Sequence, residues 1–84
     1  MVTKQIRLSS VTDVKAFVNA VSHFGVEVDL IAGRYIVDGK SIMGILSLDL
    51  SHPITMNIHT ESEGPMLSEL STFIINDTKE AGPQ

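Results

Sequence analysis

The spacing of apolar residues constrains the fold of this chain more than any other feature, because it changes repeatedly between two periods. Apolar and polar residues alternate, as in half-buried strands, over residues 2–8, 26–30 and 54–58, and a short apolar run covers 35–37. Apolar residues recur at spacings of three and four, as in amphipathic helices, over residues 11–24, 42–48 and 66–74. The predicted order is therefore β-α-β-β-α-β-α.

Residues that favour helix ends and turns stand between these segments. Ser10, with Asp13 three residues later, resembles a cap for the first helix, and Gly25 is expected to end that helix. Residues 32–34 (Ala-Gly-Arg) predict a tight turn between two strands. Pro65 suits the first position of the last helix.

Four strands with alternating faces need a cover on one side only, and three amphipathic helices can supply it. We predict an α+β open-faced β-sandwich, with a four-stranded antiparallel sheet covered on one face by three helices. The 84 residues predict a single domain over 1–84, with residues 79–84 as a frayed tail.

Composition narrows the environment in which such a chain works. It has no cysteine, which excludes disulfides and thiolate chemistry and fits a reducing cytoplasm. The sequence shows no secretory leader and no apolar run near the roughly 20 residues that span a bilayer. We therefore expect a cytoplasmic protein without membrane insertion.

The charge is unevenly distributed along the chain. Residues 1–40 carry five Lys/Arg and four Asp/Glu, whereas residues 41–84 carry one and six, which together give the net charge of −4. The acidic second half would repel a phosphate backbone, so nucleic acid is not an expected partner. An anion-binding surface, if present, should lie in the first half.

Gly39-Lys40-Ser41 resembles the end of a phosphate-binding P-loop. A P-loop needs four residues between its first glycine and the Gly-Lys pair, but five separate Gly33 from Gly39, and three of them favour a strand. A structural interpretation is that Gly39 permits a turn, Lys40 is solvated and Ser41 caps the second helix. A functional interpretation is that a phosphate on Ser41 is stabilised at the helix start.

The remaining polar groups give no clear site. The three histidines are scattered and are expected on the surface or partly packed: His23, His52 and His59. Three acids near the last helix are expected to be solvated or to favour its start: Glu61, Glu63 and Glu69. The spacing of the histidines suggests no metal site, although the fold could bring two of them together. We expect no metal, no cofactor and no enzymatic activity.

The segment from residue 39 to 50 resembles the regulatory-serine segment of the HPr family, the phosphocarrier proteins of the bacterial sugar phosphotransferase system. That segment reads roughly K-S-I-M-G-V-M-S-L-G. The matching residues are Lys40, Ser41, Ile42, Met43, Gly44, Ser47 and Leu48, with Asp49 replacing the usual glycine. The predicted element order is also that of the family, and the resemblance covers nearly the whole chain.

The phosphoryl-accepting loop of the family, G-[LI]-H-A-R-P, has no counterpart here. Counting back without gaps from Ser41 sets it against residues 8–13, with Ser10 at the histidine, Thr12 at the arginine and Asp13 at the proline. A serine phosphate does not pass its group along as readily as phosphohistidine. Thr12 offers no charge to the phosphate, and Asp13 opposes it. The resemblance thus implies no catalytic residue.

Two functional hypotheses follow from the resemblance. The first is a regulatory module without phosphohistidine transfer, phosphorylated at Ser41 by an HPr serine kinase and binding a partner such as a transcriptional regulator. Its partner surface would be Ile42, Met43 and Leu46, although Ile42 and Leu46 could equally be core residues. The alternative is a working phosphocarrier with an atypical acceptor. A third possibility is a degenerate binding domain without either modification. For the oligomeric state, we expect a monomer or a weak dimer.

Overall fold

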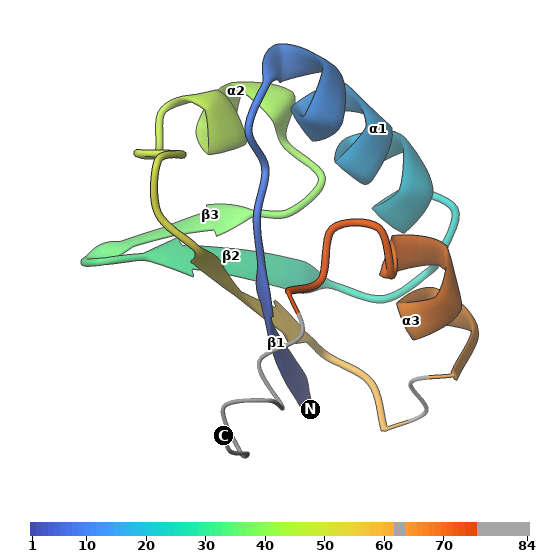
Figure 1. The fold of residues 1–84 in the computed structure, drawn as a ribbon. Helices are drawn as coiled ribbons and strands as arrows, with labels where there is room; N and C mark the ends of the chain where they lie inside the picture. Colours follow the sequence, from blue (N-terminus) through green and yellow to red (C-terminus); the bar gives the residue numbers. More distant parts are fainter. Residues whose placement is uncertain (62–63, 76–84) are drawn as a thin grey trace, which may run out of the picture.

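The computed structural model describes residues 1–61 and 64–75, and it has the predicted element order (Figure 1). The predicted tail at 79–84 and the acidic residue Glu63 lie outside the described residues. The elements are β1 (Val2–Ile6), α1 (Val11–Val21), β2 (Val28–Ala32), β3 (Tyr35–Asp38), α2 (Ile42–Leu46), β4 (Ile54–Ile58) and α3 (Gly64–Leu70). Among the described residues, no helix is long and apolar enough to cross a bilayer.

The four strands form one antiparallel sheet in the order β1-β4-β2-β3. The helices lie on one side of this sheet, which confirms the α+β open-faced sandwich (Figure 1). β1 pairs with β4, so the first and last strands of the chain lie side by side, and β3 lies at the far edge.

The core lies between the sheet and the helices, and the strand alternation decides which residues enter it. β4 buries Ile54, Met56 and Ile58 and leaves Thr55 and Asn57 on the outer face. On that outer face Thr3 donates to Asn57 at 2.8 Å and Gln5 donates to Thr55 at 2.8 Å, both across β1 and β4. The helices contribute fully buried residues such as Phe17, Val14, Ile45 and Leu70.

Two helices end earlier than the apolar spacing predicted. α1 ends at Val21, and the chain then tightens into turns in which His23 N–H donates to the Ala20 carbonyl and Phe24 N–H to that of Val21. Gly25 therefore follows this turn rather than ending the helix. α2 ends at Leu46 instead of residue 48, and the Ser47 hydroxyl donates to the Gly44 carbonyl at 2.6 Å.

The end of α3 shows a larger difference. The spacing predicted a helix through Ile74, but α3 ends at Leu70. Arg7 N–H donates to the Phe73 carbonyl and Ile75 N–H donates to that of Gln5, both at 2.9 Å, and Ile74 forms a bridge with Ile6. Hydrogen bonding to the free edge of β1 thus replaces the last helical turn, while Phe73 still packs edge-on against Phe17, with ring centroids 5.6 Å apart.

The hairpin of β2 and β3 is closed by Gly33 and Arg34 alone, because Ala32 and Tyr35 already pair. Gly33 has φ of 62°, whereas no described non-glycine residue has a positive φ. A glycine with positive φ at the first of two turn positions is typical of a type II′ hairpin. The turn is one residue shorter than predicted, and β2 starts at Val28 rather than residue 26.

Candidate functional site

The starts of α1 and α2 carry the residues that the sequence singled out. The two helices are in contact and lie next to each other on the same face of the sheet (Figure 1). Each helix is preceded by a serine in an extended conformation, Ser10 before α1 and Ser41 before α2. The predicted caps are therefore both present, and the two helix starts can be compared residue by residue.

Hydrogen bonds within residues 9–13 close the start of α1. The Ser10 hydroxyl accepts from Asp13 N–H at 3.1 Å. One carboxylate oxygen of Asp13 accepts from both the backbone N–H and the hydroxyl of Ser9, at 3.0 and 3.1 Å. This reciprocal arrangement resembles a capping box shifted by one residue. The Ser10 hydroxyl thus satisfies the N–H of Asp13, and the Asp13 carboxylate satisfies the N–H and hydroxyl of Ser9.

The polar side chains at this helix start are three hydroxyls and one carboxylate, from Ser9, Ser10, Thr12 and Asp13. Thr12 is exposed and carries no charge, and Asp13 adds a negative charge in the first turn. Val11, which the sequence placed on the apolar stripe, is 52% exposed instead. It stands at the first position of the helix.

Ser41 begins α2 with a similar cap. Its hydroxyl accepts from Gly44 N–H at 3.1 Å, and its own N–H donates to the Asp38 carbonyl at 3.0 Å. Strand β3 occupies residues 35–38, so Gly33 and Gly39 stand at its two ends and do not form one loop. This arrangement agrees with the prediction that Gly39-Lys40-Ser41 is a turn and cap rather than a P-loop.

Gly39 is required at this turn by a close approach to β2. It is buried, and its N–H donates to the Val28 carbonyl at 2.7 Å. A Cβ at this position would lie 2.8 Å from Val28 Cγ1 and 3.0 Å from the Val28 carbonyl oxygen. The sequence indicated a turn glycine, but the reason is this contact rather than a positive φ.

Lys40 was expected to be solvated, and that expectation is wrong. Its ammonium donates to the Phe24 carbonyl at 3.0 Å, and the side chain is partly buried. Its backbone N–H donates to a carboxylate oxygen of Asp38 at 2.9 Å. Lys40 therefore ties the start of α2 to the turn after α1, a contact across 16 residues of sequence that local patterns do not encode.

The three candidate partner residues differ in exposure. Met43 is 79% exposed and Leu46 is 38% exposed, whereas Ile42 is half-buried and packs against the core. Ile45, between them, is fully buried. Of the two alternatives for α2, core packing applies mainly to Ile42, and an accessible apolar surface to Met43 and Leu46.

None of the three histidines belongs to residues 9–13, which form the start of α1. His59 contacts Asp29 on the outer face of the sheet, with 2.8 Å between Nε2 and a carboxylate oxygen. In the connection before β4, Nε2 of His52 lies 3.7 Å from a carboxylate oxygen of Asp49. His23 is exposed after α1 and lines a depression shared with Glu69. In residues 1–61 and 64–75, no three metal-ligating side chains converge.

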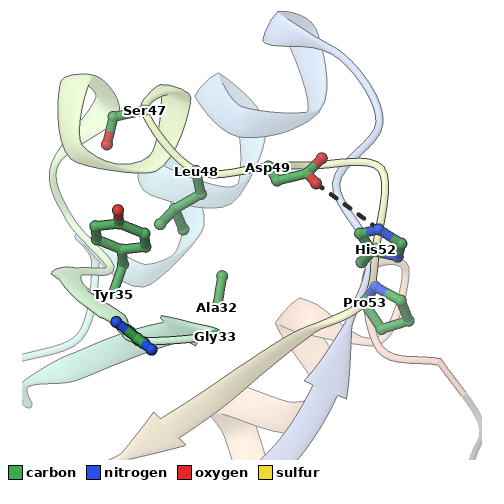
Figure 2. A pocket seen from close by; sticks show the side chains of 9 residues that line it. Ala32, Gly33, Tyr35, Ser47, Leu48, Asp49, His52 and Pro53 are labelled. Carbon is green, nitrogen blue, oxygen red and sulfur yellow. Dashed lines mark ion pairs between the residues drawn. The ribbon is translucent and has the colours of Figure 1, made fainter.

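A pocket that the sequence did not indicate lies between the β2–β3 turn and the connection from α2 to β4 (Figure 2). It has a volume of about 600 Å³. Tyr35 and Leu48 contribute apolar surface, and Asp49 and His52 lie together on its rim. Hydrogen bonds from the hydroxyl and the backbone N–H of Ser51 hold the pKa of Asp49 below its ordinary value.

Known proteins share the family and the fold of this chain. The family model described as the phosphorylation site of the PTS HPr component matches residues 13–76. HPr-C-His from Thermoanaerobacter tengcongensis has a similar structure, with a TM-score of 0.68 and 25% identity over 99% of this chain and 97% of that one.

A phosphocarrier protein HPr from Bacillus anthracis str. Ames shares the fold, with a TM-score of 0.66 and 23% identity over 88% of this chain and 96% of that one. No curated protein sequence matches the chain. The family match covers well over half of the chain and includes the whole of α2 with Ser41. The chain belongs to the HPr family of phosphotransferase-system components.

Proposed function

We propose that this protein is a regulatory member of the HPr family that works through phosphorylation of Ser41 and does not transfer phosphate through a histidine. It acts in the cytoplasm by binding other proteins and catalyses no reaction itself. An HPr serine kinase modifies it, and the modified form binds a transcriptional regulator.

The observation that carries the proposal is the position of Ser41. It stands at the first turn of α2, one residue before the half-buried Ile42 and two before the exposed Met43. Leu46 lies one turn further along the same helix. A change in charge at Ser41 therefore falls beside an accessible apolar surface, where it can alter which partner binds.

A phosphate at Ser41 is also compatible with the helix. The cap bond to Gly44 N–H places the serine oxygen next to the free N–H groups of the first turn. A negative group there is favoured by the helix dipole. The bond from the Lys40 ammonium to the Phe24 carbonyl holds the turn before α2 in place. We therefore expect phosphorylation of Ser41 to change the charge of the surface without unfolding α2.

The start of α1 supports the negative part of the proposal. The gapless count from Ser41 assigns Ser10 to the position of the family histidine, and the Ser10 hydroxyl is engaged as a cap. The Asp13 carboxylate lies in the same turn and opposes a second anion there. His23 follows α1, and His59 contacts Asp29 on the outer face of the sheet. His52 contacts Asp49, and the pairing of Ile6 with Ile54 brings its segment next to the chain that leads into α1.

The test is incubation of the protein with an HPr serine kinase and ATP, followed by intact-mass measurement. We expect a gain of one phosphate that is lost in Ser41→Ala and retained in Ser10→Ala. The second variant is a matched control, since both serines cap a helix through one hydrogen bond at 3.1 Å. Absence of the gain while an ordinary HPr is phosphorylated would refute phosphorylation of Ser41.

A phosphocarrier role with an atypical acceptor is tested separately. The protein is incubated with phosphoenolpyruvate and the first enzyme of the phosphotransferase relay. An acid-labile, base-stable label would contradict the proposal and favour the relay. We expect no such label on the wild type or on Ser41→Ala. An ordinary HPr, which should be labelled, is the positive control.

The partner surface requires its own measurement. Binding of the phosphorylated protein to a transcriptional regulator is compared with binding of Met43→Lys and of Lys15→Met, which alters an exposed residue of α1. We expect the substitution at Met43 to reduce binding about tenfold or more, because an exposed apolar contact is replaced by a charge. Equal binding of all three proteins would show that the partner does not use this part of α2.

A further inference from the structure

We propose that two copies of this protein associate through the free edge of β3, in an antiparallel pair centred on Ile36. The pairing would join the two sheets into one of eight strands. The pairing is formed by β3 and does not require modification of Ser41, so it does not depend on the proposed function.

The two edges of the sheet differ in the structure. The edge of β1 is covered by the segment after α3, through the Ile6–Ile74 bridge and the bond from Arg7 to Phe73. β3 pairs only with β2 within residues 1–61 and 64–75. It also carries two of the most exposed large apolar side chains, Tyr35 at 70% and Ile36 at 66%. An exposed apolar edge strand is a template for pairing with another chain.

The hairpin register selects Ile36 as the centre of the pair. In a hairpin closed by a two-residue turn, the flanking residues, here Ala32 and Tyr35, direct their backbone groups at each other. Because these directions alternate along an antiparallel pair, the N–H and C=O of Ile36 point away from β2. A two-fold axis at Ile36 lets the two copies exchange both backbone hydrogen bonds at that residue.

This register is also complementary in charge. Residues at equal distances before and after the axis face each other, which brings Arg34, in the turn directly before β3, next to Asp38 of the other copy, twice. Both side chains are exposed in the single chain. Asp38 uses one carboxylate oxygen to accept from Lys40 N–H, which leaves the other oxygen for the arginine.

The same register extends an apolar row across the outer face of the sheet. Ile31 and Ile36 are cross-strand partners within one chain, and Ile36 would face Ile36 of the second copy. Four isoleucines would then lie in one row, flanked on each side by an arginine–aspartate pair. The apolar pair of Ile31 and Ile36, on an otherwise polar outer face, would thus pack against the same pair of the second copy.

The helices leave room for this arrangement. α2 lies over Val37, since a Cβ on Gly44 would be 3.3 Å from the Val37 Cβ. Around an axis at Ile36, the two Val37 residues are two positions apart along the strand and one strand apart across it. That separation is about 8 Å. Because α2 lies over Val37, the two α2 helices would lie next to each other across the axis, at a spacing comparable with that of packed helices.

Sedimentation of the full chain up to about 1 mM, with charge variants, tests the proposal. We expect reversible dimers that dissociate about tenfold more readily in Arg34→Glu and in Asp38→Lys, because each variant faces like charges across the axis. An equimolar mixture of these two variants should recover the wild-type association, since every facing pair is again opposite in charge. Lys15→Glu, which changes the net charge as Arg34→Glu does, should associate as the wild type does.

Cross-linking tests the register without any change of charge. The chain has no cysteine, so Ile36→Cys places one thiol per copy at the proposed axis, and Thr3→Cys places one on the outer face of the other edge strand. Under mild oxidation we expect disulfide dimers to form at least tenfold faster with Ile36→Cys. A monomeric wild type at 1 mM, no recovery in the mixed variants, or equal oxidation rates would each overturn the proposal.

Discussion

The starts of α1 and α2 have the same capping element in different surroundings. Both begin with a serine hydroxyl that accepts from the N–H three residues on, at 3.1 Å. At α1 the other contacts are local, because Asp13 accepts from the neighbouring Ser9. At α2 they are distant, because Gly39 contacts Val28 and Lys40 bonds the Phe24 carbonyl.

This difference shows that the hydrogen bonds of a helix start can be made by its own residues or by segments distant in the sequence. The turn before α1 is closed by its own residues and ends in an acidic, exposed surface. The turn before α2 joins strand β2, the end of α1 and the apolar side of α2 in a few residues. A modification at Ser41 would therefore act on a turn that is hydrogen-bonded to distant segments, whereas the side-chain hydrogen bonds at Ser10 are local.

The largest expected effect tests whether the α2 turn depends on its contact with β2. Gly39→Ala places a Cβ 2.8 Å from Val28 Cγ1 and 3.0 Å from backbone, and we expect a loss of about 1–3 kcal/mol in the free energy of unfolding. Gly25→Ala is the control, since no atom lies within 4 Å of a Cβ there. Urea denaturation measures both variants, and similar losses would show that the approach to Val28 is not limiting.

The next effect tests whether the two caps are equivalent. Ser10→Ala and Ser41→Ala each remove one hydroxyl acceptor from a first-turn N–H, and we expect each to lower the free energy of unfolding by about 1 kcal/mol. The measurement is again urea denaturation at neutral pH. A loss at Ser41 several times that at Ser10 would mean that the α2 cap also supports its tertiary contacts.

An effect of similar size tests the connection through Lys40. Lys40→Met keeps most of the apolar stem but removes the bond to the Phe24 carbonyl, and we expect a loss of about 0.5–1.5 kcal/mol. Lys15→Met, on the exposed side of α1, should change the free energy of unfolding by less than about 0.5 kcal/mol. Equal stability of the two variants would show that the ammonium contributes nothing in this position.

The smallest effect concerns a carboxylate that belongs to neither helix start. The Ser51 hydroxyl and N–H hold the pKa of Asp49 below its ordinary value of 3.8. Because the folded state favours the ionised form, the associated stability is present above about pH 4 and is lost as the pH falls through the lowered pKa. Ser51→Ala should raise the pKa of Asp49 towards 3.8 in an NMR titration of its carboxyl carbon, and an unchanged value would contradict this cause.

Local sequence patterns predicted the elements but not all of their ends. Strand alternation placed Ile54, Met56 and Ile58 in the core, and serine before an apolar run located the cap of α2. The predicted end of α3 was wrong because Phe73 and Ile75 bond to β1. Such an edge is created by the fold, and no spacing within residues 64–75 encodes it.

The sequence by itself determined the order of strands and helices, the buried face of the alternating strands and the position of Ser41 before α2, because these depend on residues within a few positions of one another. Only the tertiary structure decided why Gly39 must be glycine, where the Lys40 ammonium goes and which edge of the sheet stays open. The physical reason is that each of these depends on contacts between segments distant in sequence, whose proximity arises when the sheet and helices pack.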